Sequence, residues 1–279
     1  MKTFVRVLII ITVLFLVGVI AVLYAIYRSD PEQQEVLEEK TFDEEIEDME
    51  VIVENSRVDF LPSDDGTFRI VLTGNSDDFT LETDVSDGRL TVEIEDRSRF
   101  FMFDFNRSSS LQVYVPANGL ASLSVDSTNG AIDAQDIQAA ELSLEANNGS
   151  IQLEAIESEI VEVETANGRI ELTSMEADIT VRASNGRINL TDVSGEVQAK
   201  ANNGRIELVV DTLDFPVDFE TNNGHIEIQT ENKPANARIE ASVDNGSIDV
   251  YGQDSGEVSF GSGEVLINLV SNNGRIVVE

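Results

Sequence analysis

Cys and His, which often act as nucleophile and general base in enzymes, are almost absent from this chain. The 279-residue sequence contains no Cys and a single His, His225, with 53 Asp and Glu against 18 Lys and Arg. The lack of Cys excludes disulfides, a thiolate nucleophile and a Cys-based metal site. No HExxH, phosphate-binding loop or G-x-S-x-G motif is present. The many carboxylates leave glycosidase-type acid–base chemistry as the one enzymatic alternative, and we predict no enzyme, cofactor or metal site.

The most regular polar residues are Asn-Gly pairs followed by isoleucine. The glycines lie 18–22 residues apart, except for a last interval of 28 residues. An internal period of this length is typical of repeat architectures. We predict structural turns at Asn129-Gly130, Asn148-Gly149, Asn167-Gly168, Asn185-Gly186, Asn203-Gly204, Asn223-Gly224, Asn245-Gly246 and Asn273-Gly274.

Apolar residues alternate with polar ones on both sides of each turn, which indicates two strands that share one apolar face. Asn-Gly is also a strong hairpin signal, so a meander or sandwich of hairpins stays open. The near-constant period and the short connections, which carry an inward residue of their own, favour a β-solenoid with coils stacked about 4.8 Å apart. The predicted fold is therefore an all-β, single-stranded solenoid with coils of about 18–22 residues.

The solenoid explains the residues at each turn. Gly is expected to turn the corner with a positive φ, where a Cβ would be strained. Asn tolerates a left-handed conformation, and stacked asparagines could form a ladder of side-chain amides.

An outward column beside the turns contains Arg169, Arg187, Arg205 and His225 next to a mainly acidic column. Cross-strand pairing is the simplest interpretation. A ligand-binding stripe is the alternative. His225 occupies an Arg position, so we interpret it as an exposed column member and not as a catalytic base.

The formal net charge of −35 disfavours nucleic acid as a partner, because phosphates would be repelled. It leaves loose association with divalent cations open.

The first 50 residues differ in composition from the rest. The run from Val7 to Tyr27 has no charge and is long enough, at about 30 Å as a helix, to cross a bilayer. We expect residues 1–28 to form a cytoplasmic stub and a transmembrane anchor, with a cleaved signal peptide as the alternative. Lys2 and Arg6 precede this run, which predicts a single-pass protein with the remainder outside the membrane. Residues 29–50 are strongly acidic and are predicted to be a solvated spacer. The alternative is that this acidic segment is a site for a specific partner.

The predicted extracytoplasmic domain covers residues 51–279, with atypical first coils at 51–116 and the regular repeats at 117–279. "SDGRL" around Gly88 is interpreted as a degenerate repeat. Phe100, Phe101 and Phe103 are expected to form a strand or cap core, or else an exposed interaction patch. The last coil, around Gly274, is expected to present an open strand edge for a partner or a second copy.

The segments "VDFLPSDDG", "DGRLTVEIED" and "LQVYVPANGLASLSVDSTNGAI", with the later NG-x-I coils, resemble a bacterial family of adhesin-like β-strand repeat proteins. The anchor and acidic segment are similar to its LiaG-type members from Gram-positive bacteria, which are associated with envelope-stress regulators. The resemblance implies a right-handed β-solenoid (β-helix) and brings no catalytic residues.

From residues and resemblance together, we expect a non-enzymatic, membrane-anchored cell-envelope scaffold, interaction or stress-response accessory protein. Its expected partners are the bacterial membrane and either envelope proteins or wall polymer. A polysaccharide-binding surface adhesin and a carbohydrate-active β-helix enzyme stay open as alternatives.

Overall fold

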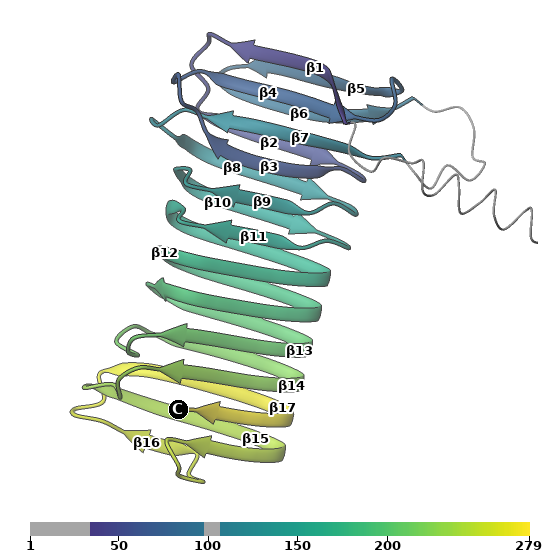
Figure 1. Ribbon diagram of the computed structural model, residues 1–279. Coiled ribbons are helices and arrows are strands. Elements are labelled where there is room, and N and C mark those ends of the chain that lie inside the picture. Colours follow the sequence, from purple (N-terminus) through teal and green to yellow (C-terminus); the bar gives the residue numbers. More distant parts are fainter. Residues whose placement is uncertain (1–33, 98–106) are drawn as a thin grey trace, which may run out of the picture. The chain divides into compact units, whose positions relative to one another are not determined.

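The computed structural model describes residues 34–97 and 107–279 of the chain. Within these ranges all regular elements are β-strands, so the prediction of an all-β fold is confirmed there (Figure 1). The strands are β1 (Glu35–Phe42), β2 (Asp48–Val53), β3 (Arg57–Pro62), β4 (Phe68–Gly74), β5 (Phe79–Ser86), β6 (Arg89–Asp96), β7 (Ser109–Val115), β8 (Leu120–Ser127), β9 (Ile132–Gln135), β10 (Ala139–Ala146), β11 (Ile151–Glu154), β12 (Glu157–Ser194), β13 (Val197–Val210), β14 (Val217–Thr230), β15 (Ala237–Val250), β16 (Glu257–Ser259) and β17 (Val265–Val278).

The chain divides into two compact units, Met1–Glu35 and Val36–Glu279. The predicted anchor at residues 1–28 lies outside the described residues. In the described ranges there is no helix with the length and apolar character needed to span a bilayer. The fold described below is that of the second unit.

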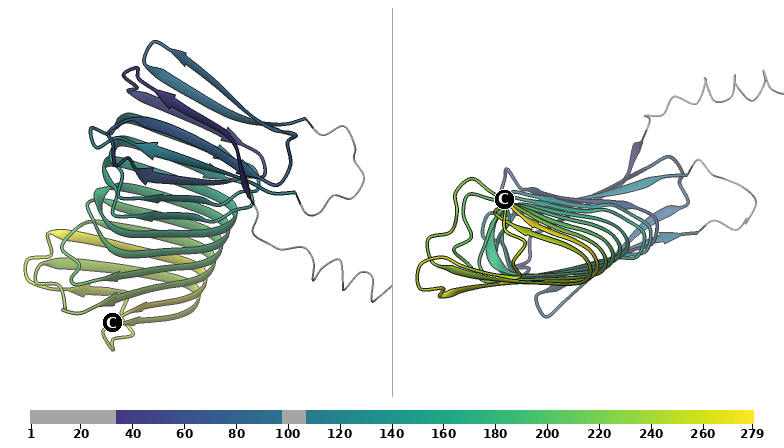
Figure 2. Two further views of the ribbon diagram at one scale, coloured as in Figure 1. Left: turned by 45° about the horizontal axis from the view of Figure 1, so that its top comes forward. Right: turned by 90° about the horizontal axis from the view of Figure 1, so that it is seen from below.

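The central strands form coils that stack in parallel, one repeat on the next. β10 pairs with β8 on one side and β12 on the other, which places Leu142 opposite Leu123 and Val161. From β12 onward, the strand continues through the Asn-Gly corner, and β12 covers two successive coils over its 38 residues. Viewed along the stack, the coils overlie one another (Figure 2). This parallel pairing of residues one repeat apart defines a solenoid and excludes the hairpin meander.

The core consists of rows of apolar residues, one from each coil. The isoleucines two positions after the repeated glycines are almost fully buried in the stack, except Ile248 of β15, which is partly buried at its edge. Alternating burial along each strand places apolar residues inward and charged residues outward. The strict alternation fixes the register, because a slip of one residue would turn each apolar side chain outward.

The order of the coils differs from their order in the sequence at the C-terminal side of the stack. β17 pairs in parallel with both β14 and β15, so the last repeat of the sequence lies between two earlier ones (Figure 1). The prediction of an open edge at the coil of Gly274 is therefore wrong. β15 is the outermost coil, and the short antiparallel strand β16 covers part of it along Arg238–Glu240.

The other end of the stack is built in the same way. β2 pairs with β6 and β8, and β3 pairs with β7 and β9, so an early coil again lies between two later ones. Antiparallel strands close this end, with β5 on β6 and β4 on β7. At each end, the coil that is first or last in the sequence thus lies between two other coils. Antiparallel strands cover at least part of the outermost coil, which limits exposed parallel edges.

Two predictions about this region need correction. The acidic residues 35–50 are not a solvated spacer, because β1 and the start of β2 lie here and Ile46 and Met49 are buried. Leu37 and Phe42 of β1 pack against the core, and the backbone N–H of Leu81 donates to the Glu38 carboxylate at 2.9 Å. The "SDGRL" segment is not a degenerate coil. Asp87 and Gly88 have φ values of 52° and 79° and close the β5–β6 hairpin, in which Ser86 pairs with Arg89.

Candidate functional site

The most continuous polar feature of the stack is a ladder of asparagine side chains. The Nδ2 of each Asn donates to the Oδ1 of the Asn in the adjacent coil, over donor–acceptor distances of 2.9–3.1 Å. In spatial order the ladder consists of Asn55, Asn129, Asn148, Asn167, Asn185, Asn203, Asn223, Asn273 and Asn245. It runs along one edge of the solenoid from the β2–β3 corner to the outermost coil, β15.

The repeated glycines form a column beside the ladder, for a reason that differs from the predicted one. None of those from Gly130 to Gly224, nor Gly274, has a positive φ, and Gly246 has a nearly extended φ of 158°. A Cβ on Gly186 would instead overlap the carbonyl oxygen of Gly168, and a Cβ on Gly204 would overlap that of Gly186. Close stacking of backbone on backbone therefore requires glycine here.

The basic column lies on the other side of the glycines. Arg187 is opposite Arg205, Arg205 opposite His225, and His225 opposite Arg275. Arg169 pairs with Glu171 at 3.3 Å and Arg205 with Glu227 at 3.5 Å. The Nδ1 of His225 accepts a hydrogen bond from the backbone N–H of Arg275 at 3.2 Å, which holds this side chain against the next coil of the column.

Sequence analysis missed several members of this edge. In the corner between β2 and β3, Asn55 begins the ladder. Ser56 takes the place of the repeated Gly, and the carbonyl of Ser56 faces Gly130. The signal was present as "NSRV", which matches N-G-R-I with conservative exchanges. Three further asparagines extend a second ladder, in which Asn222 donates to Asn202 and Asn272 donates to Asn222, each at 2.9 Å.

Next to the first ladder members, Arg57 takes the position of the basic column. It contacts Asp59 at 2.7 Å and Asp133 at 3.1 Å. The hydrogen bond that Arg57 donates to the Asp59 carboxylate raises the pKa of the Arg57 guanidinium. Burial raises the pKa of Asp133, and the nearby Arg57 charge only partly offsets it. These ion pairs link the β2–β3 corner to the adjacent coil, and they place no nucleophile beside a general base.

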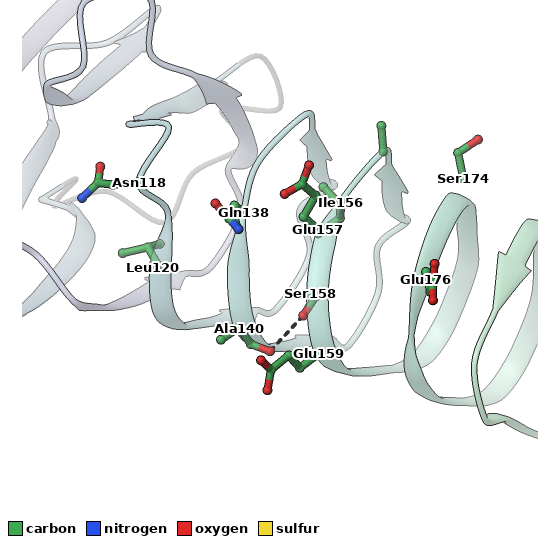
Figure 3. Close-up of a pocket in the computed structure, with 11 residues that line it drawn as sticks. Asn118, Leu120, Gln138, Ala140, Ile156, Glu157, Ser158, Glu159, Ser174 and Glu176 are labelled. Atoms are coloured by element: carbon green, nitrogen blue, oxygen red, sulfur yellow. Dashed lines mark hydrogen bonds between the residues drawn. The ribbon is translucent and has the colours of Figure 1, made fainter.

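A shallow hollow lies away from this edge and has a volume of ≈ 660 Å³. Its wall includes Glu157, Glu159, Glu176 and Ser158 (Figure 3). The three carboxylates come from different points along the coils and do not converge. The Ser158 hydroxyl donates to the carbonyl of Ala140 at 3.1 Å. Within residues 34–97 and 107–279, no three acidic or His side chains are arranged to hold a metal ion.

The predicted aromatic patch cannot be placed. Phe100, Phe101 and Phe103 lie outside the described residues.

Parallel coils, a continuous amide ladder and an adjoining basic column define the class of this molecule as a β-solenoid repeat protein with a linear polar edge. The chain belongs to the Toastrack DUF4097 family, whose model matches residues 46–279. This match begins within the acidic segment, in agreement with the buried Ile46.

Three solved structures are similar to this chain to different degrees. A candidate adhesin from Bacteroides fragilis has a TM-score of 0.50 and 13% sequence identity, with 89% of this chain and 99% of that chain covered. A candidate cell adhesion protein from Clostridium sporogenes has a TM-score of 0.36 and 12% identity, covering 86% and 97%. A candidate adhesin from Parabacteroides merdae has a TM-score of 0.34 and 12% identity, covering 87% and 96%. No curated protein sequence matches this chain.

Proposed function

We propose that the protein is a non-enzymatic binding or scaffold protein of the cell envelope. The observation that carries this proposal is the uninterrupted polar edge, in which the amide ladder runs from Asn55 to Asn245 with donors and acceptors repeated at each coil. A linear array on a rigid stack suits recognition of an extended partner. Membership of the Toastrack family, and the adhesin names of the similar structures, agree with a role in contact and not in catalysis.

The proposal also includes a membrane anchor, the orientation of the chain across the membrane and the handedness of the coil. The uncharged run from Val7 to Tyr27 would anchor the chain, and Lys2 and Arg6 would keep the N-terminus cytoplasmic. The solenoid would then be extracytoplasmic. A right-handed coil is proposed because parallel crossover connections are overwhelmingly right-handed. A LiaG-type accessory role in envelope stress follows from the resemblance of the anchor and acidic segment.

A surface adhesin that binds polysaccharide is the second candidate. It is favoured by the asparagine and arginine side chains along the edge, which supply donors and acceptors suited to hydroxyl and acid groups.

Protease protection in intact bacterial cells tests the topology. A tag after Glu279 should be removed by external protease, whereas a tag before Met1 should be protected. Crosslinking of the tagged full-length protein, followed by identification of what co-purifies, tests the role. Recovery of specific membrane proteins supports the scaffold function, and recovery of wall polymer supports the adhesin. Recovery of neither, or a protected C-terminal tag, would contradict the proposal.

A further inference from the structure

Four coils that are adjacent in space carry an unusual row of basic residues. They are the coils of Gly186, Gly204, Gly224 and Gly274, and the residue after each glycine is Arg187, Arg205, His225 or Arg275. Neighbouring coils are about 4.8 Å apart, and like charges directly opposite one another on adjacent strands are destabilising. A row of this kind therefore has a cost in the isolated protein.

Pairing with the neighbouring acidic column does not account for the whole row. Two positions beyond Arg205 and His225 lie Glu207 and Glu227, but the same positions beyond Arg187 and Arg275 hold Asn189 and Val277. Neither Arg187 nor Arg275 forms a salt bridge with any residue in the described ranges, and both are exposed. Two arginines thus flank Arg205 and His225 in space without a carboxylate partner.

The local charge is opposite to that of the whole molecule. On the other side of the amide ladder, Arg182 lies opposite Lys200, and Lys200 pairs with Glu220 at 3.0 Å. From four positions before to three positions after the glycine, these four coils contain five Lys and Arg and three Glu, whereas the chain has a net charge of −35. At physiological ionic strength, charges beyond about 8 Å are largely screened, so this local excess decides which ions collect here.

Amides complete the surface between the two groups of cations. Asn203, Asn223 and Asn273 belong to the main ladder, and Asn202, Asn222 and Asn272 to the second one. A side-chain amide has two N–H donors. Each donor Asn in these ladders uses one N–H for its neighbour. Asn273 also donates to the backbone carbonyl of Asn222 at 3.4 Å, whereas Asn203, Asn222, Asn223 and Asn272 keep a second N–H for a ligand.

We propose that this surface, the amide–arginine edge, binds a linear polymer that carries an anionic group on each repeat unit. The edge is formed by Arg182, Arg187, Lys200, Arg205, His225, Arg275 and the six asparagines Asn202, Asn203, Asn222, Asn223, Asn272 and Asn273. The polymer lies along the stacking axis, with its anionic groups on the guanidinium forks and its polar backbone on the amides. Arg binds phosphate and carboxylate groups in a bidentate manner. The inference rests on the proposed binding function and names the ligand class.

The test uses full-length protein purified in detergent and titrated with inorganic polyphosphate, oligogalacturonate and orthophosphate. Affinity for at least one polymer should rise with its length, because each further group binds intramolecularly, and orthophosphate should bind much more weakly. Preference for polyphosphate identifies a phosphate-bearing ligand, and preference for oligogalacturonate identifies a uronic-acid ligand.

A triple variant and a charge-matched control separate the edge from general electrostatics. Arg187→Gln, Arg205→Gln and Arg275→Gln together should weaken polymer binding by about tenfold or more, since each removes a charge-assisted bond. The control, Arg89→Gln, Arg97→Gln and Arg238→Gln, removes three exposed ion-pair arginines and should bind as wild type does. The edge variant should fold normally, because it removes like-charge contacts.

Equal weakening in both variants, or no dependence on polymer length, would overturn the inference. The inference of a linear polymer ligand would also be wrong if vesicles containing phosphatidylglycerol bound the edge while both soluble polymers did not. If crosslinking in cells recovers specific proteins and no polymer binds, the proposed binding function stands and this inference alone fails.

Discussion

The coils turn at two kinds of corner, and the two corners differ in where glycine is needed. At the Asn-Gly corner the backbone of one coil presses on the carbonyl of the next, and φ is not positive from Gly130 to Gly224. At the opposite corner φ is left-handed, between 51° and 55°, yet the residues are Asp136, Ala155, Ser174 and Asp192. At these two corners, glycine thus stands where the coils touch, and the left-handed position has other residues.

At the corners, close contact between coils therefore restricts the residue type more than backbone conformation does. A left-handed φ costs a residue with a Cβ roughly 1–2 kcal/mol, which each coil can tolerate once. An overlap of Cβ with a backbone carbonyl cannot be relieved without separating the coils, and this would break the parallel hydrogen bonds on both sides of the corner.

The largest effect is expected for a substitution at the Asn-Gly corner. Gly186→Ala should lower the free energy of unfolding by about 4 kcal/mol or more, because its Cβ would overlap the carbonyl of Gly168. Gly66→Ala is the matched control, since Gly66 has a φ of 75° and nothing within 4 Å of an added Cβ. Its cost should be about 1–2 kcal/mol from strain alone. Urea denaturation of both variants measures the two losses in free energy of unfolding. Equal losses would show that contact between coils is not the reason for glycine at this corner.

The amide ladder should contribute less. Asn185 donates to Asn167 and accepts from Asn203, whereas Asn245 at the end of the ladder makes only the bond to Asn273. Asn185→Ala should therefore cost about 1–2 kcal/mol and Asn245→Ala about half of that. The comparison is made by thermal unfolding. If the interior and terminal substitutions have the same effect, the ladder does not act through its amide bonds.

The repeat itself could be predicted from the sequence because alternation fixes which face is buried. The coil order could not, since the segments around Gly224, Gly246 and Gly274 have the same apolar pattern and could stack in any order with equal register. The position of β17 depends instead on β16 and its turns, where Gly261 and Gly263 have φ values of 59° and 71°. The repeat pattern in the sequence does not indicate that the last coil lies between two earlier ones.

First coils were predicted from residue 51 onward, but the corner at Asn55-Ser56 and the start of β2 at Asp48 were not, for a different reason. Ser56 stands where the other coils have glycine, and the acidic residues before it suggested a solvated segment. The alternation of Met49, Val51 and Val53 was the informative signal, because it begins within the acidic segment and places these three side chains in the core.

At the opposite corner, substitution should stabilise the protein slightly. Ala155 has a φ of 52°, and Asn tolerates this conformation better than Ala does. Ala155→Asn is expected to raise the free energy of unfolding by about 0.5–1 kcal/mol. Asp136→Asn is the control and should change it little, because Asp already suits a left-handed position. A loss of stability in Ala155→Asn would mean that this corner is not strained.

The pH-dependent effect concerns Tyr251, which takes the left-handed position of the outermost coil with a φ of 50°. Its hydroxyl shares a 2.8 Å hydrogen bond with that of Thr230 at the end of β14, and its backbone N–H donates to Val278 of β17. Tyr251 thus links the three strands whose order departs from the sequence. Burial raises its pKa above the ordinary value of 10.0, and the Thr230 hydrogen bond offsets this in part.

The raised pKa sets the sign of the pH dependence. Above pH 10 the unfolded chain loses the Tyr251 proton before the folded protein does, so the stabilisation present below pH 10 is lost as pH rises through the folded pKa. Tyr251→Phe removes this group and should lose about 1 kcal/mol at neutral pH with the Thr230 bond. The difference in stability between wild type and variant should then shrink between neutral pH and pH 11 in denaturation experiments. A constant difference would show that Tyr251 titrates alike in both states and that burial at this corner does not hold its proton.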